Sequence, residues 1–200
     1  MTAVWKPTAT LPADATPFAI RAEQASDVRA REALLDASFG EGRHARTCQR
    51  LRDGRAPAEG LAFTAVHKGK LAGTIRLWHV SAGGIPALVL GPLAVDASCR
   101  DLGIGAALMN HALHIAKARG HAAIILRGDA AYYSRFGFSA EKTGGLELPG
   151  PFERERLLAI ELRDGALDEA CGMIVATGAA APEARGHRAR KTRPPLLCAA

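Results

Sequence analysis

The order of apolar and polar positions predicts a strand and two helical stretches in the first quarter of the chain. Residues 18–21 form a short apolar segment of strand type. A helical pattern then begins at Ser26 or Asp27, either of which can cap a helix, and it extends to about Phe39, just before a glycine. A second helical stretch is expected at 44–52.

Three runs of strand type follow, at 61–66, 71–80 and 87–95. The first two are separated by four residues that include Gly69, and a glycine in so short a connector predicts a hairpin. The third run is interrupted by Gly91-Pro92. Because proline cannot donate to a strand ladder, we expect a bulge at this point, or a splay from the neighbouring strand.

Helical periodicity returns in the second half of the chain, from Gly103 to Gly120, and a continuous apolar strand follows at 122–126. Asp129 can cap a short helix, and 156–162 is the last expected strand. The resulting order is mixed α/β, with one strand–helix–strand crossover and no internal repeats.

Length and composition allow one domain with flanking tails. The 200 residues are 48% hydrophobic, which is enough for a sizeable core. We expect residues 1–17 to be a flexible leader and the chain to be disordered from about 177, where Ala, Gly, Pro and Arg dominate. The start of the chain has no unbroken apolar segment, and no stretch approaches the roughly 18 apolar residues of a membrane span. These features predict a cytoplasmic protein without a membrane partner.

The net charge of +6 belongs mostly to the C-terminal tail. Residues 182–200 contain five cations and a single acid, so the rest of the chain carries only +2. Because this tail has no aromatic residue to stack on bases, nucleic-acid binding is not expected. The four cysteines form no Cys-x-x-Cys pair, and His111 and His114 lack a third ligand, so neither disulfides nor a metal site are expected.

The segment Arg100-Asp101-Leu102-Gly103-Ile104-Gly105-Ala106 lies between an apolar strand and an amphipathic helix. The unpaired N–H groups of a helix start attract anions, and glycines let phosphate oxygens approach the backbone. The pattern is common by chance, and such glycines can be turn residues only. The sequence lacks the P-loop signature, and the acidic residue of the dinucleotide fingerprint is missing at its expected distance.

A second motif, Tyr133-x-x-x-Gly137-Phe138, follows the strand at 122–126. Together with Arg76-Leu77-Trp78 and the segment from Leu90 to Asp96, it makes the sequence resemble the GNAT superfamily of acetyl-CoA-dependent N-acetyltransferases. The resemblance covers about 18–162 and is closest to a bacterial branch with Leu-Gly-Pro-Leu-Ala-Val and Gly-Asp-x-x-Tyr-Tyr-x-Arg-Phe-Gly-Phe segments. It implies one GNAT-like α/β domain at 18–165, with a mixed, mostly antiparallel central sheet and helices on both faces, followed by a C-terminal extension at 166–200.

The resemblance also implies a site for acetyl-CoA as co-substrate. The strand residues Leu93, Ala94 and Val95 would bind the pantetheine arm. The pyrophosphate would lie on the loop, whose expected binding residues are Arg100, Leu102, Gly103, Ile104, Gly105 and Ala106. Tyr133, rather than Tyr132, matches the family's general acid by its spacing to the Gly-Phe pair. A phenol can protonate the departing thiolate after an amine attacks the thioester.

The general base, the acceptor and the oligomeric state stay open in the sequence. Many relatives carry a glutamate on the strand before the phosphate loop, but 86–95 contains no acid. Glu41, His44 and His79 are alternatives, as is a chain of water molecules. The alternatives for the acceptor are a small-molecule amine, a peptide amine and a protein lysine, and a homodimer is compatible with the sequence. A non-catalytic module that binds CoA is the alternative function, since it needs the loop but no proton donor.

Overall fold

The computed structural model describes residues 17–181. Apart from Pro17, the leader expected at 1–17 lies outside these residues, and so does the basic tail beyond 181. No helix in the described part is long and apolar enough to cross a membrane.

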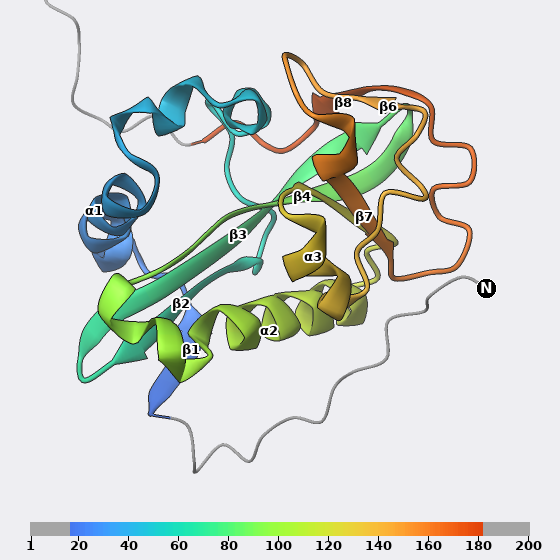
Figure 1. Cartoon of the computed structure of the whole chain (residues 1–200). Coiled ribbons are helices and arrows are strands. Elements are labelled where there is room, and N and C mark those ends of the chain that lie inside the picture. Colours follow the sequence, from blue (N-terminus) through green and yellow to red (C-terminus); the bar gives the residue numbers. More distant parts are fainter. Residues whose placement is uncertain (1–16, 182–200) are drawn as a thin grey trace, which may run out of the picture.

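Strands form one sheet, and three α-helices and several short 3-10 turns surround it (Figure 1). The strands are β1 (Phe18–Ala22), β2 (Ala62–His67), β3 (Lys70–Ala82), β4 (Ile85–Val95), β5 (Ala123–Arg127), β6 (Leu146–Glu147), β7 (Leu157–Glu161) and β8 (Gly172–Ala176). The α-helices are α1 (Val28–Phe39), α2 (Ile104–Ala118) and α3 (Ala130–Tyr133). The 3-10 helices are η2 (Ala25–Asp27), η3 (Glu41–Ala45), η4 (Thr47–Leu51), η5 (Ala97–Leu102), η6 (Ser134–Phe136) and η7 (Arg154–Arg156).

The sheet has the order β1-β2-β3-β4-β5-β7 and is mostly antiparallel. Only β4 with β5, and β6 with β8, run parallel. The parallel β4–β5 pair needs a crossover, and α2 supplies it. This arrangement confirms the mixed, mostly antiparallel sheet that the sequence predicts.

Helices cover both faces of the sheet, as the alternation of side chains on β4 demonstrates. Ala94 packs against Leu34 and Leu35 of α1, whereas its neighbours Leu93 and Val95 contact the core that contains α2. Successive side chains on a strand point to opposite faces, so α1 and α2 lie on opposite sides of the sheet. Further along the sheet, the face that α1 covers carries a second buried cluster, which includes residues of η4 and β8.

The predicted hairpin and the predicted strand interruption are both present. β2 and β3 are joined by Lys68 and Gly69, which both have positive φ (48° and 75°), as a two-residue hairpin turn requires. On β4 the register against β3 shifts at Gly91-Pro92, whose peptide bond is cis. The strand therefore bulges where proline removes a ladder donor.

Two regions differ from the predictions. The stretch expected as a helix at 44–52 consists of short 3-10 turns, η3 and η4. In addition, β8 lies beyond the predicted domain limit near 165, yet it pairs with the far end of β3 and with β6. Thr177 and Gly178, where disorder is predicted to begin, donate backbone hydrogen bonds to His79 O. The described chain thus stays on the sheet beyond 165.

Candidate functional site

The strands β4 and β5 separate just where the bulge occurs. Their pairing is limited to Leu88 with Ile124 and Val89 with Ile125. From Leu90 to Val95, β4 keeps its partner β3 but has none on the side of β5. The bulge itself is held by Trp78, whose indole N–H donates to Gly91 O at 2.6 Å. A free strand edge therefore opens next to a fixed bulge.

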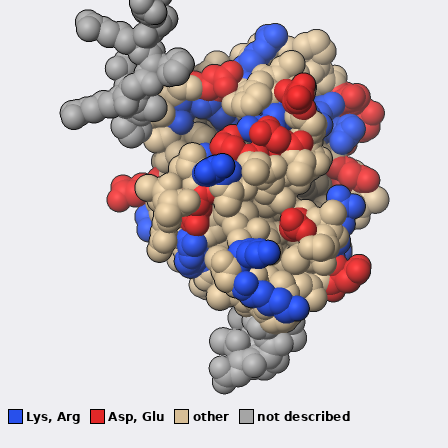
Figure 2. All heavy atoms as spheres, turned by 90° about the vertical axis from the view of Figure 1, so that its left-hand side faces the viewer, with Lys and Arg blue, Asp and Glu red and all other residues tan. Residues whose placement is uncertain are grey.

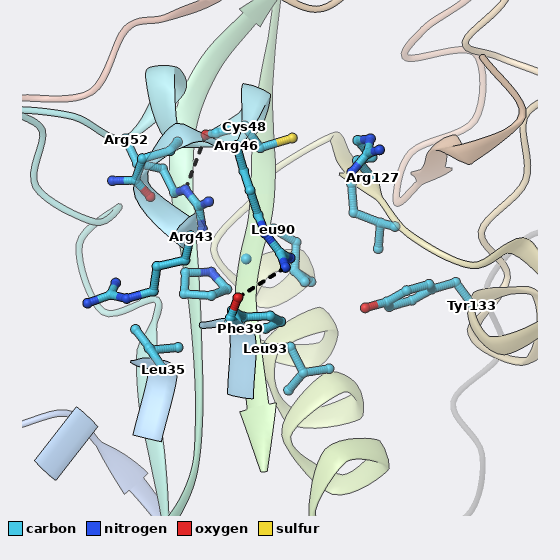
Figure 3. Close-up of a pocket in the computed structure, with 14 residues that line it drawn as sticks. Leu35, Phe39, Arg43, Arg46, Cys48, Arg52, Leu90, Leu93, Arg127 and Tyr133 are labelled. Atoms are coloured by element: carbon cyan, nitrogen blue, oxygen red, sulfur yellow. Dashed lines mark hydrogen bonds between the residues drawn. The ribbon is translucent and has the colours of Figure 1, made fainter. Parts of the chain in front are cut away.

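A pocket of about 150 Å³ lies at this opening (Figure 3). Its lining comes from α1, the 3-10 segment that follows α1, the bulge of β4, the end of β5, and α3. The lining residues are Leu35, Phe39, Arg43, Arg46, Cys48, Gln49, Arg52, Leu90, Gly91, Pro92, Leu93, Leu126, Arg127 and Tyr133.

Tyr133 directs its hydroxyl into this pocket (Figure 3). Its ring lies directly over Gly128, where an added Cβ would be only 2.2 Å from Tyr133 Cε2. On its other sides the ring has edge-type contacts with Tyr132 (centroids 4.9 Å apart) and with Phe138 (6.1 Å). Burial, with a smaller contribution from Tyr132 and Asp129, raises the pKa of Tyr133 to about 12. The phenol therefore stays protonated at neutral pH.

Tyr132, the alternative in the sequence, does not line the pocket. Its ring lies under the guanidinium of Arg135, at 4.1 Å. Its hydroxyl approaches the first turn of α2, where a Cβ on Gly105 would be 3.2 Å from the oxygen. The two neighbouring tyrosines thus face different parts of the molecule, and only Tyr133 reaches the bulge.

The segment from Arg100 to Ala106 forms the end of η5 and the first turn of α2, as predicted. Gly103 connects the two helices with φ of 72°, a conformation that glycine adopts without strain. The first bond in this turn of α2 runs from Ala107 N–H to Gly103 O (3.0 Å), so the N–H groups of Ile104, Gly105 and Ala106 have no partner within the helix. Arg100 is exposed beside them. This end of α2 can bind an anion.

Four of the pocket's side chains are arginines, and none is an acid. Arg43 is paired with Glu32 and Asp36, and Arg127 is paired with Glu153. By contrast, Arg46 and Arg52 have no ion pair with a carboxylate in the described part of the chain. The pocket therefore has an excess of positive charge.

None of the three candidates for a general base reaches the pocket. Glu41 and His44 are exposed on η3, and His79 lies on a different surface hollow, near His121 (ring centroids 5.4 Å apart). The thiol of Cys48 does line the pocket, but burial raises the pKa of Cys48, so it stays a thiol at neutral pH. No described lining residue is a carboxylate or an imidazole.

Sequence reasoning missed the arginines of the pocket altogether. Arg46 and Arg52 lie in one short segment, Arg127 lies far from them along the chain, and only the fold brings the three to one place. The signal that could have found them is the run of four arginines between Phe39 and Gly54, which is unusually dense for a 3-10 segment.

Elsewhere, His111 packs edge-on against Phe63 (4.6 Å), and no group of three or more potential metal ligands occurs among residues 17–181.

The chain is similar to known proteins over most of its length. Residues 27–138, more than half of the chain, match the model of the acetyltransferase (GNAT) family. The N-acetyltransferase YhbS of Escherichia coli K12 is 30% identical over 157 residues, which is 78% of this chain and 93% of YhbS. The crystal structure of E. coli YhbS in complex with CoA superposes with a TM-score of 0.70 at 29% identity, covering 85% of this chain and 94% of that one.

A second solved structure is similar over most of its length. It is a GNAT family acetyltransferase from Brucella melitensis in complex with acetyl-CoA, with a TM-score of 0.54 and 25% identity, covering 74% of this chain and 97% of that one. The family match spans both predicted motifs, the loop at 100–106 and the segment at 133–138. The chain therefore belongs to the GNAT family of acetyltransferases.

Proposed function

We propose that this protein transfers the acetyl group of acetyl-CoA to an amine by direct attack, with Tyr133 as the general acid. The observation that carries the proposal is the position of the Tyr133 hydroxyl, in a pocket at the bulge of β4. The proposal is supported by the family of the chain and by the CoA and acetyl-CoA bound to its structural relatives.

The cofactor would lie along the opening between β4 and β5. Leu93, Ala94 and Val95 have no partner strand on that side, so their backbone groups can bind the pantetheine amides as a further strand would. The N–H groups at the start of α2, which have no partner within the helix, would then donate hydrogen bonds to the pyrophosphate, with Arg100 beside them. This arrangement directs the thioester toward the bulge and the pocket.

The reaction needs charge stabilisation and one proton at defined places. A neutral amine attacks the thioester carbon, and a backbone N–H at the bulge can stabilise the resulting oxyanion. When the tetrahedral intermediate collapses, the C–S bond breaks, the sulfur takes up the proton of Tyr133, and the nitrogen releases its extra proton to solvent. Solvent then returns a proton to Tyr133, so that the net products are the amide and the CoA thiol. A phenol with a raised pKa is a weaker acid. The thiolate forms in the same dry pocket, however, where desolvation also raises its proton affinity.

The amine can lose its proton without a carboxylate or histidine. Positive groups close to an ammonium ion lower its pKa, because like charges disfavour the charged form. Four arginines line the pocket, and two of them have no carboxylate partner. We infer that the amine releases its proton to solvent and attacks in its neutral, nucleophilic form.

Calorimetric titration with acetyl-CoA, followed by thiol release in the presence of amines, tests the proposal. We expect saturable binding and amine-dependent release of CoA. Absence of binding at millimolar acetyl-CoA would contradict the proposal, and binding without release on any amine would favour the non-catalytic alternative.

Substitution of Gly103 by alanine should weaken acetyl-CoA binding about tenfold. A side chain at φ of 72° costs about 1–2 kcal/mol, and relief of that strain moves the N–H groups that would hold the pyrophosphate. Gly120 at the other end of α2 is the matched control, since it has φ of 81° and equally open surroundings. Both variants should lose similar thermal stability, but Gly120→Ala should keep the wild-type affinity. Equal affinities in the two variants would refute the assignment of this loop.

The raised pKa of Tyr133 predicts an unusual pH dependence. A tyrosine of ordinary pKa is half ionised at about pH 10 and would lose half of its acid form there. With a pKa of about 12, Tyr133 keeps its proton at that pH. The ratio of single-turnover rates of wild type and Tyr133→Phe should therefore be constant from about pH 7 to pH 10. Titration of the amine cancels in this ratio, and a twofold fall by about pH 10 would contradict the raised pKa.

A further inference from the structure

Two arginines of the pocket carry charges that the described protein does not neutralise. Arg52 bonds through Nε to the Cys48 carbonyl oxygen (3.2 Å), and Arg46 bonds to the Phe39 carbonyl oxygen (3.4 Å) while its guanidinium lies 4.9 Å from the Phe39 ring. The acid next to Arg52 in the chain, Asp53, accepts a hydrogen bond from the side chain of Gln49 (2.7 Å). Both guanidinium groups thus keep N–H donors for a ligand.

Arg52 is the more constrained of the two. Burial lowers the pKa of its guanidinium. Cys48 and Asp53 oppose this shift, and the positive charges of Arg43 and Arg46 add to it. Arginine nevertheless stays charged in proteins. A partly buried cation without a counter-ion costs free energy, and an anionic ligand that pairs with it recovers that cost. Arg52 therefore favours an anion at this place.

The place is the bulge of β4, where the thioester is expected. A Cβ built on Gly91 would be 3.7 Å from Arg52 Nη1 and within 4 Å of no other side chain or backbone group beyond its immediate neighbours. Arg127 borders the pocket from the end of β5, and its Nε–H is buried without an acceptor in the described structure. In Figure 3, Arg46 extends toward the middle of the pocket, whereas Arg43 points away from it.

No broad basic surface surrounds this positive charge on the face that carries α1. Figure 2 shows acidic and basic side chains interspersed over the face that carries α1, with no broad basic field. In the proposed function the pyrophosphate lies at the start of α2, whose first residues do not line the pocket. The arginines therefore fit a compact anionic group better than a polyanion or the coenzyme.

Resting on the proposed function, we propose that the acceptor carries a compact anionic group, a carboxylate or a phosphate, close to its reactive amine, and that Arg52 and Arg46 bind this group. The planar guanidinium binds both of these anions with paired hydrogen bonds. Such an acceptor anchors its anion at the arginines and presents its amine to the thioester at Gly91. Polycationic amines, which lack the anion, are repelled by the same field.

Matched pairs of amines test the chemistry of the acceptor. Tyrosine with tyramine, histidine with histamine and phenylalanine with phenethylamine differ only in the carboxylate. Phosphoethanolamine with ethanolamine tests the phosphate, and spermidine tests a polycation. Thiol release from acetyl-CoA should favour the anionic member of at least one pair by about tenfold or more in kcat/KM, the scale of a charge-assisted hydrogen bond. Spermidine should be the poorest substrate.

Variants of Arg52 then assign the effect to the pocket. With the preferred anionic acceptor, Arg52→Gln should raise KM about tenfold or more, and Arg52→Lys should restore part of the loss. In either variant the KM of the uncharged member should change much less than that of the anionic member, so that the preference between the two members falls. Arg29→Gln is the matched control, because Arg29 is exposed on α1 and does not line the pocket.

The outcomes separate this inference from the function on which it rests. Turnover of charged and uncharged members at equal rates would overturn the inference and leave the acetyltransferase intact. A rise in the Kd for CoA in Arg52→Gln, with the preference between paired amines unchanged, would assign the arginine to the coenzyme and also overturn it. Acetyl-CoA binding without turnover of any amine would overturn the proposed function, and the inference with it.

Discussion

Replacement of Tyr133 by phenylalanine should lower the rate of acetyl transfer about 100-fold, the lower end of what a general acid contributes. The Tyr133 hydroxyl and the partly buried thiol of Cys48 are the proton donors of suitable type among the described lining residues, and burial raises the pKa of that thiol. Because the thiolate of CoA is a fair leaving group, loss of the donor slows the reaction without abolishing it. The rate should be measured in a single turnover, so that product release does not hide the chemical step.

Acetyl-CoA affinity should be unchanged in this variant, since the expected contacts of the coenzyme lie on β4 and at the start of α2. Tyr132→Phe is the matched control. It removes a neighbouring hydroxyl that does not line the pocket, so the single-turnover rate should change little. A Tyr133→Phe enzyme with the wild-type single-turnover rate would remove the general-acid assignment.

The sequence predicted the central strands and α2 because their patterns are unambiguous. The strand at 122–126 is apolar throughout, and β5 is accordingly buried on both faces. The Gly91-Pro92 interruption predicted the bulge for a reason of backbone chemistry, namely a missing donor. Such local causes can be recognised without knowledge of the fold.

The missed elements are those in which the local pattern is short. In β8, buried Ile174 lies between Met173 and Val175, which are each 47% exposed. This alternation is the pattern of a half-buried strand, but it extends over only five residues and follows a turn-rich segment. The segment at 44–52 has the composition of a helix. It forms two short 3-10 helices instead, each of them too short for a regular α-helix.

The candidate site likewise has parts that the sequence predicted and parts that it did not. The loop at the start of α2 and the spacing from Tyr133 to Phe138 are local motifs, and the family comparison spans both. The arginines of the pocket come from 43–52 and from the end of β5, so their proximity depends on tertiary structure. The sequence therefore predicted the residues proposed to bind the coenzyme, but it did not predict the arginines proposed to bind the acceptor.

Substitution of Gly128 by alanine should lower the rate nearly as much as loss of the Tyr133 hydroxyl. A methyl group at this position would be 2.2 Å from Cε2 and 2.6 Å from Cδ2 of the Tyr133 ring. The ring cannot easily move aside, because it contacts Tyr132 and Phe138. The backbone of Gly128 is fixed in turn, since its N–H donates to Arg156 O at 2.9 Å. We therefore expect a displaced hydroxyl, and a loss of about 1–3 kcal/mol in stability from overpacking.

A matched control distinguishes misplacement of the tyrosine from general destabilisation. Gly144 has no close neighbour and no positive φ, so Gly144→Ala should leave rate and stability near wild type. Thermal unfolding and acetyl-CoA titration of Gly128→Ala would show whether the protein is folded and still binds its coenzyme. A folded variant that binds acetyl-CoA but reacts slowly is the expected result.

The double variant Gly128→Ala/Tyr133→Phe gives the sharper test. If Gly128 acts only by positioning the Tyr133 hydroxyl, its substitution has nothing further to remove once that hydroxyl is absent. The losses in rate should then be strongly non-additive, with the double variant close to Tyr133→Phe alone. Additive losses would mean that Gly128→Ala slows the enzyme by another route, and that the contact between Gly128 and the Tyr133 ring does not control the position of the acid.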